Sequence, residues 1–265
     1  DGVVLDSRPL LIADGGSNPT VTNQGSQFLL TWKEANSSGR VLAARFDSDA
    51  GLLDAPPLLL GAAPGIFEPA SATSDGTQYV VAWSQGNGPQ AVARRISTDG
   101  GLLDPTPISL GMTGYQPSIA SDGVLSTIMV IETPGNERWG AAQLRPDGTV
   151  AASRTILQGT SFSAFDTAVA ALPGQTMAVV GLRLRVGNSN LGPVKHGLSI
   201  STSPPLDTGT PFLLQLLLNS QADPSIAVAS DKTLLAWGDD RGPGWLNGQK
   251  RVWGALLNRE LPSAS

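Results

Sequence analysis

The sequence predicts an all-β fold, a five-bladed β-propeller of four-stranded antiparallel blades. Two observations support this prediction. Apolar residues alternate with polar ones in short runs that Asp-Gly pairs separate, a pattern typical of antiparallel hairpins. The same pattern recurs at about 50 residues, the spacing expected of propeller blades. We therefore expect one domain over residues 1–265, without helices.

The clearest repeat covers residues 68–111. A Pro-led apolar segment comes first, then the turn Asp75-Gly76 and an alternating run that ends at Trp83. A second run, 91–96, leads through Asp99-Gly100 into a last apolar segment. Four strands in this order predict an antiparallel meander, and the second run predicts its third strand.

The remaining repeats follow the same plan with different fidelity. The third carries Ile131 where the second-strand Trp is expected, and the fourth is degenerate, with strands expected at 167–171, 175–182 and 195–200. The approximate boundaries of the repeats are 13–61, 62–111, 112–159, 160–216, and 217–258 together with 1–12.

The first residues read as the fourth strand of a repeat, whereas the last repeat stops after its third strand. We expect residues 3–12 to pair antiparallel with residues 251–258, because a ring hides its end strands by pairing them. A start in mid-repeat also fits one domain of a longer polypeptide or complex.

Composition excludes several classes of function. A net charge of −5 gives no basic patch, which disfavours nucleic acid as a partner. The chain has no cysteine, so thiolate metal sites are excluded. The apolar run at 211–218 is too short to cross a bilayer. We expect no cofactor.

Trp32, Trp83 and Trp237 recur at the end of the second strand. They suit either an aromatic platform for sugars or a wedge between blades, and recurrence at one position favours the wedge. The Asp-Gly turns lack the carboxylate spacing of a calcium loop. The lone His196 has no other His near it in the sequence, so we expect a structural role and no metal site.

Loops between the second and third strands vary in length and composition, and such variation on a regular scaffold marks a binding face. The most distinctive is 238–250, whose Trp245 has no counterpart in other repeats. Trp245 suits stacking on a sugar ring, or it covers its own blade. The candidate ligand-binding residues on this face are Asp239, Asp240, Arg241, Trp245 and Asn247, with Asn190 on the opposite wall.

A polar residue precedes the innermost strand of each repeat, and fivefold placement would direct these residues at the mouth of a central channel. There they would bind a ligand, water or a structural cation on the axis. Alternatively, a polar residue before Pro only begins a strand. The five positions are Asn18, Glu68, Gln116, Asp166 and Asp223.

With its repeats aligned, the chain resembles secreted bacterial repeat proteins of the myxobacterial and planctomycete type. These share a pattern like P-x-x-A-x-D-G-x-x-Y-V-V-A-W, followed by A-x-R-I-x-x-D-G-x-x-L-D-x-x-P-I-x-L, best matched at 68–111. In blade count it also resembles tachylectin-type lectins, although its loops differ from one another. The chain is also similar to five-bladed arabinanase-type glycosidases, which place three carboxylates at inner-strand positions, often with an Asp-Pro as at Asp223-Pro224. This resemblance implies Glu68, Asp166 and Asp223 as catalytic carboxylates.

Two hypotheses for function follow. The first is a secreted or cell-surface binding module that recognises a glycan or an extracellular protein through its variable loops. The alternative is a glycoside hydrolase that uses the three carboxylates Glu68, Asp166 and Asp223, two of which would have to flank a common pocket.

Overall fold

The computed structural model describes most of the chain. Beyond Ile156, it describes side chains at only some positions. The described residues are 11–34, 39–49, 51–62, 70–86, 88–132, 138–158, 162–172, 175–186, 189–201, 206, 212–215, 221–228, 232–239 and 251–258.

Every regular element in the described residues is a β-strand, and all paired neighbours run antiparallel, as the alternating sequence predicts. Four hydrogen-bonded sheets result: β1-β2-β3-β4, a seven-stranded sheet from β11 to β5, β12-β13-β14-β15, and β16-β17-β18. The strands are β1 Gly16–Gln24, β2 Gln27–Glu34, β3 Arg40–Phe46, β4 Leu58–Ala62, β5 Ser71–Ser74, β6 Gln78–Gln85, β7 Gln90–Ser97, β8 Ile108–Ser121, β9 Ser126–Glu132, β10 Arg138–Leu144, β11 Val150–Gln158, β12 Phe162–Leu172, β13 Gln175–Val186, β14 Ser189–Ser201, β15 Phe212–Gln215, β16 Gln221–Val228, β17 Lys232–Asp239 and β18 Arg251–Asn258.

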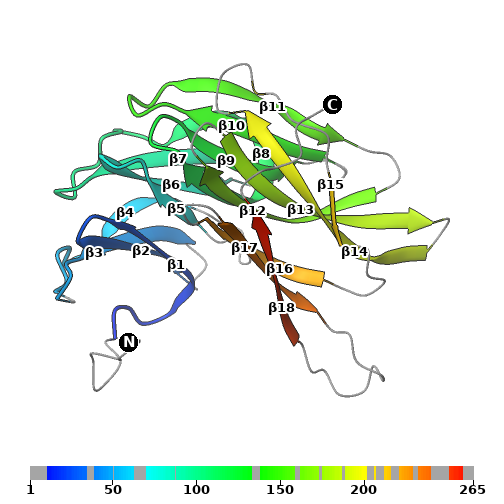
Figure 1. Ribbon diagram of the computed structural model, residues 1–265. Coiled ribbons are helices and arrows are strands. Elements are labelled where there is room, and N and C mark those ends of the chain that lie inside the picture. Colours follow the sequence, from blue (N-terminus) through cyan, green and yellow to red (C-terminus); the bar gives the residue numbers. More distant parts are fainter. Residues whose placement is uncertain are drawn as a thin grey trace.

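The seven-stranded sheet exists because β8 serves two repeats. Its first part pairs with β7 and its second part with β9. The strands thus form five repeats: β1–β4, β5 to early β8, late β8 to β11, β12–β15, and β16–β18. Their innermost strands lie side by side in the order β1, β5, β8, β12, β16, which gives the fan of sheets in Figure 1.

The Asp-Gly turns form as predicted. Gly76, Gly100, Gly123 and Gly148 have φ between +88° and +92°, a region that glycine enters without the steric penalty of a Cβ. In the first of these turns, the Asp75 carboxylate accepts hydrogen bonds from the backbone N–H of Thr77 (2.8 Å) and of Gln78 (2.9 Å). Side chain and backbone together therefore fix where each hairpin reverses.

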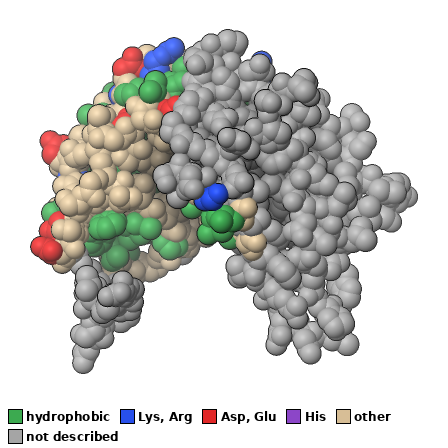
Figure 2. All heavy atoms as spheres, viewed as in Figure 1, with side chains coloured by type: hydrophobic (Ala, Val, Ile, Leu, Met, Phe, Trp, Pro, Cys, Tyr) green, Lys and Arg blue, Asp and Glu red, His purple; other side chains and the backbone are tan. Residues whose placement is uncertain are grey.

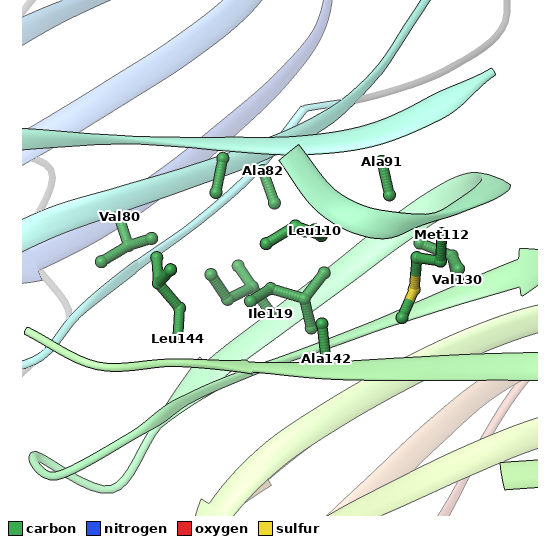
Figure 3. Packing of buried hydrophobic residues seen from close by; sticks show 11 residues of the cluster. Val80, Ala82, Ala91, Leu110, Met112, Ile119, Val130, Ala142 and Leu144 are labelled. Carbon is green, nitrogen blue, oxygen red and sulfur yellow. The ribbon is translucent and has the colours of Figure 1, made fainter. Parts of the chain in front are cut away.

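The core consists of apolar layers between successive repeats, because each sheet buries both of its faces. Figure 3 shows the layer between the second and third repeats, where Val80, Ala82 and Leu110 meet Val130 and Leu144. In the preceding layer, Trp83 is 1% exposed and its indole N–H donates to the carbonyl of Ala62 at 3.2 Å. The wedge interpretation is confirmed for Trp83. Trp32 is also buried, but the residues that pack with it belong to its own repeat and to positions 12 and 13, so its place between two repeats stays a prediction. The Trp237 side chain lies outside the described residues.

The residue that matches Trp83 in the third repeat is Val130, and the expectation of Ile131 is wrong. Asp122 caps its turn as Asp75 does. Val130 lies eight positions after Asp122, just as Trp83 lies eight positions after Asp75. Val130 faces the second repeat, whereas Ile131 packs with Val169 of the fourth. The error arises because the segment from the leading Pro to the turn is one residue shorter in the third repeat.

The innermost strands β1, β8 and β16 do not begin at the polar residue before Pro. They start earlier and are interrupted at this point by a register shift, between Ser17 and Thr20 in β1 and between Tyr115 and Ser118 in β8. Proline has no N–H to give to a ladder, so a bulge accommodates it. Asn18 and Gln116, which precede these prolines, have φ of +51° and +50°.

Two buried ion pairs, here called the rim pairs, tie successive repeats together at the outer strands. In Arg45–Asp54 the guanidinium Nη2 lies 2.7 Å from the carboxylate, and in Arg95–Asp104 the distance is 2.6 Å. Hydrogen bonding to Asp54 raises the pKa of Arg45. Arg45 also donates to the carbonyl of Thr98 in the next repeat, and Arg95 donates to that of Pro146.

The expected strand at 3–12 lies largely outside the described residues. Within the described part of the chain, no ladder joins β18 to the N-terminal segment, and ring closure stays a prediction.

Apolar side chains gather on the part of the first repeat visible in Figure 2. No helix in the described residues has the length and apolarity to cross a bilayer.

Candidate functional site

A polar pocket of about 530 Å³ lies between the second and third repeats. It opens at the end of the sheets where the second strands end and the third strands begin, the end that the variable loops indicated. Five strands, β7 to β11, supply its walls. The lining residues are Gln90, Ser109, Gly111, Met112, Thr113, Glu132, Arg138, Ser153, Arg154 and Thr155.

Two bulges shape the pocket. The pairing of β7 with β8 slips between Gln90 and Val92, next to Gly111 with φ of +72°. A second slip interrupts the pairing of β10 with β11 at Gly140. A bulge bends a strand and redirects its side chains. Here the two bulges flank the space between the sheets, so polar residues of the outer strands line it.

Glu132, the last residue of β9, is the buried acid of the pocket at 9% exposure. Its Oε2 accepts a hydrogen bond from the Thr155 hydroxyl at 2.7 Å. The Nε of Arg138, the first residue of β10, lies 3.5 Å from the same oxygen. The carboxylate thus has one close neutral donor and one longer ionic contact.

Gly140 makes room for this carboxylate. A Cβ at position 140 would lie 2.8 Å from Glu132 Oε1. Gly140 pairs with Val130 on the neighbouring strand. In the other two repeats the matching pairs are Val92 with Trp83 and Leu42 with Trp32. A glycine replaces a bulky residue here, and the carboxyl group of Glu132 occupies the space.

The pocket has the chemistry of a binding site for a hydrophilic molecule. Guanidinium, amide and hydroxyl groups supply donors and acceptors, and the guanidinium groups of Arg138 and Arg154 outnumber the single carboxylate of Glu132 among the lining residues. Glycoside hydrolysis by the usual route needs two carboxyl groups. Among the described lining residues, Glu132 supplies the one carboxyl group.

The structure corrects two of the predicted loop residues. Asp239 is not in a loop: it ends β17 and pairs with Arg251. Asn190 lies in β14 and pairs with Arg185, because β13 and β14 extend further than the sequence indicated. Hydrogen-bonded strands thus replace part of each expected loop. Asp240, Arg241, Trp245 and Asn247 lie outside the described residues.

The residues predicted for the channel mouth share one position in the fold. Asn18, Gln116 and Asp223 lie within bulges of their innermost strands, and Asp166 follows one directly. Glu68 lies outside the described residues, as do the side chains of Asp166 and Asp223. Among the residues that the structure describes, no three His, Cys, Asp or Glu side chains are grouped to hold a metal.

Sequence reasoning missed the pocket, although one signal was present. An acid at the end of the second strand and an arginine at the start of the third recur as Glu34 and Arg40, and as Glu132 and Arg138. The chain also departs from its own pattern at Gly140, where other repeats carry a bulky residue. This departure adds to the signal at Glu132, but neither observation shows that groups from two repeats meet in one pocket.

No protein-family model matches the sequence, and no curated protein matches it. Solved structures are similar at low identity. A protein of unknown function from Dyadobacter fermentans matches with a TM-score of 0.57 at 11% identity, over 92% of this chain and 79% of that one. A GH43 endo-arabinanase from Bacillus licheniformis matches with a TM-score of 0.46 at 11% identity, over 93% and 95% of the chains.

A third similar structure is the β-propeller domain of the Trilobed protease from Pyrococcus furiosus, described as having an open velcro topology. It matches with a TM-score of 0.53 at 7% identity, over 94% of this chain and 72% of that one. This likeness, with the all-antiparallel sheets arranged as a fan, supports a β-propeller fold for the chain.

Proposed function

We propose that this chain is a binding module that takes a saccharide between its second and third repeats. The observation that carries the proposal is the convergence of hydroxyl, amide and guanidinium groups on one pocket beside the buried Glu132. A volume of about 530 Å³ suits a small ligand, since such sites span roughly 300–1,000 Å³. Sugar hydroxyls need donors and acceptors at this density.

A saccharide fits this pocket better than a protein surface does. A stable protein partner covers about 800 Å² of each surface, whereas this site is a concave space with polar walls. We further propose that the module acts outside the cell or at its surface. This location rests on the resemblance of its repeats to secreted bacterial proteins.

The substitution Gly140→Val tests the proposal, because it restores the bulk that Val92 has in the second repeat. The new Cβ would displace the flexible end of Glu132, not the backbone, so folding should survive. We expect binding in a glycan screen to fall at least tenfold. The matched control is Gly88→Val, at a position with no atom within 4 Å of the new Cβ. Undiminished binding by Gly140→Val would contradict the proposal.

A second candidate function is glycoside hydrolysis at the innermost strands. One observation favours it: Asp166 and Asp223 lie at register shifts of the neighbouring strands β12 and β16, Asp166 directly after one and Asp223 within the other. Together with Glu68 they would supply the pair of carboxyls, about 5–5.5 Å or about 6.5–9.5 Å apart, that hydrolysis requires.

Release of reducing sugar from a panel of polysaccharides tests this candidate. Asp166→Asn and Asp223→Asn should each abolish it, while Gly140→Val should leave it intact. Turnover that survives both aspartate changes would rule out these residues. The absence of turnover on every polysaccharide would leave the binding function as the better account.

A further inference from the structure

We propose that the pocket selects an acidic saccharide, and that the ligand's carboxylate binds the guanidinium group of Arg138. This inference rests on the proposed function and deepens it by naming the class of saccharide. It depends on three features: the open geometry of Arg138, the contacts that hold Glu132 away from it, and the charge of the pocket.

Arg138 keeps most of its hydrogen-bonding capacity. A guanidinium group has five N–H donors, and charge-assisted contacts to carboxylates are about 2.7–2.9 Å long. Within the described residues, its ion pair is the single Nε–Oε2 contact with Glu132, at 3.5 Å. Its side chain is 34% exposed, so a ligand can reach it.

The matching arginine of the first repeat shows what a satisfied pair looks like. Arg40 holds Glu34 with two hydrogen bonds, 2.6 Å from Nε to Oε2 and 2.5 Å from Nη2 to Oε1. This is the bidentate arrangement that arginine and a carboxylate prefer. Arg138 also stands at the start of its strand, but it does not form a bidentate pair with Glu132.

The difference has a structural cause. The Thr155 hydroxyl binds Oε2 of Glu132, and the absence of a Cβ at Gly140 lets Oε1 settle against the strand. Glu132 is thereby held away from the bidentate position. The guanidinium group is left next to a carboxylate that neutralises it only in part, and a second carboxylate from a ligand can complete the fork.

The charge of the pocket agrees with this. Arg138 and Arg154 face one carboxylate, which leaves an excess of positive charge in a chain whose net charge is −5. Arg154 has contacts of its own, so we assign the fork to Arg138 and only a long-range contribution to Arg154. A neutral sugar could accept hydrogen bonds from these groups, but it would gain no attraction between opposite charges.

Isothermal titration with an oligogalacturonide and with its fully methyl-esterified form tests the inference. The two saccharides share their sugar rings and linkages, and esterification replaces each carboxylate charge by a neutral methyl ester. We expect the parent protein to bind the acid at least tenfold more tightly than the ester, and less tightly as salt is added. Arg138→Gln should remove the preference, and Arg138→Lys should restore only part of it, because lysine keeps the charge but not the fork.

Arg40→Gln is the matched control and should keep the full preference for the acid. Equal binding of acid and ester by the parent would overturn the inference and leave saccharide binding intact. The same loss in Arg40→Gln as in Arg138→Gln would overturn the assignment to Arg138. A polyglutamate peptide that binds as tightly as the oligogalacturonide would overturn the choice of a saccharide. Binding of no saccharide at all would overturn the proposed function together with the inference.

Discussion

Trp83 joins two repeats through both its ring and its nitrogen. The ring packs with Leu29, Val41 and Leu60 of the first repeat, and Gly61 leaves it space, since a Cβ there would lie 2.7 Å from the ring. The indole N–H reaches the carbonyl of Ala62. One side chain thus supplies apolar area and satisfies a buried donor in the same interface.

Replacing Trp83 by Ala should lower the free energy of unfolding by about 3–5 kcal/mol, as for other buried aromatic side chains. Urea denaturation followed by circular dichroism measures the change. Val124→Ala is the control, because Val124 is exposed and its loss should stay within about 0.5 kcal/mol. A stable Trp83→Ala protein with impaired ligand binding would show that the wedge role is wrong.

Asp99 should titrate below its ordinary pKa of 3.8, because the hydroxyl of Ser97 and then the N–H of Gly101 bind its charged form. Its folded pKa lies below the unfolded one, so its contribution to stability is present above the unfolded pKa. That contribution is lost as pH falls through the folded value. Carboxyl NMR titration measures this, and Ser97→Ala should move the pKa of Asp99 back up. No movement would mean that the Ser97 contact does not form in solution.

At the scale of the strands, the rim pairs explain why the outer edges of the first three repeats hold together. The third strand supplies the arginine and the segment before the fourth strand supplies the aspartate. The spare guanidinium donor then binds the turn of the following repeat. Gly100 and Gly148 serve this contact, because a Cβ at either would meet the incoming guanidinium at 2.6 and 2.8 Å.

Asp104→Ala should therefore destabilise the protein by about 3–5 kcal/mol, because Arg95 would keep a buried charge without its partner. Thermal unfolding measures the loss. Glu34→Gln is the comparison: its pair with Arg40 is much more exposed, and its loss should cost under about 1 kcal/mol. Equal effects of the two changes would show that burial does not govern these pairs.

The sequence predicts strands and turns here because both depend on local chemistry. The Asp-Gly pairs at 75–76, 99–100, 122–123 and 147–148 form turns at the expected residues. The prediction from sequence fails where a bulge changes the number of residues between two matching positions. Pro19 and Pro117 sit inside strands that continue on both sides, and a one-residue difference before Asp122 moves the wedge position from 131 to 130. Bulges depend on pairing with a neighbouring strand, which a local pattern does not contain.

At the scale of the whole molecule, the pocket was beyond sequence reasoning because it belongs to two repeats at once. Gln90 and Thr113 come from one sheet face and Glu132 and Thr155 from another, and only their packing brings the groups together. The variable loops lie at the end of the sheets where the pocket opens. They did not indicate Gly140, whose effect is to leave space.

The two ends of the chain carry complementary features. Ile12 and Ala13 pack on the Trp32 cluster, and in the next layer Leu60 and Gly61 occupy the same positions over Trp83. Residues 12 and 13 therefore lie on the first repeat as the end of a fourth strand would. In the last repeat, Leu234 is 50% exposed although the matching Val80 is 1% exposed, and Leu256 is 65% exposed. This face lacks the cover that the other repeats have.

We expect the N-terminal strand to pair with β18, which would bring the first repeat against this face, and the repeats fix the register. In the first repeat, Leu42 of the third strand pairs with Leu59 of the fourth. Trp253 of β18 matches Leu42, and Leu11 of the N-terminal segment matches Leu59. Directly opposed residues lie about 4.5–5.5 Å apart at Cα, within disulfide reach. The chain has no cysteine, so Leu11→Cys with Trp253→Cys should form an intramolecular disulfide on mild oxidation and raise the melting temperature. Leu11→Cys with Leu257→Cys is out of register and should stay reduced. Cross-linking of neither pair, or of both at one rate, would show that the ring does not close through this strand.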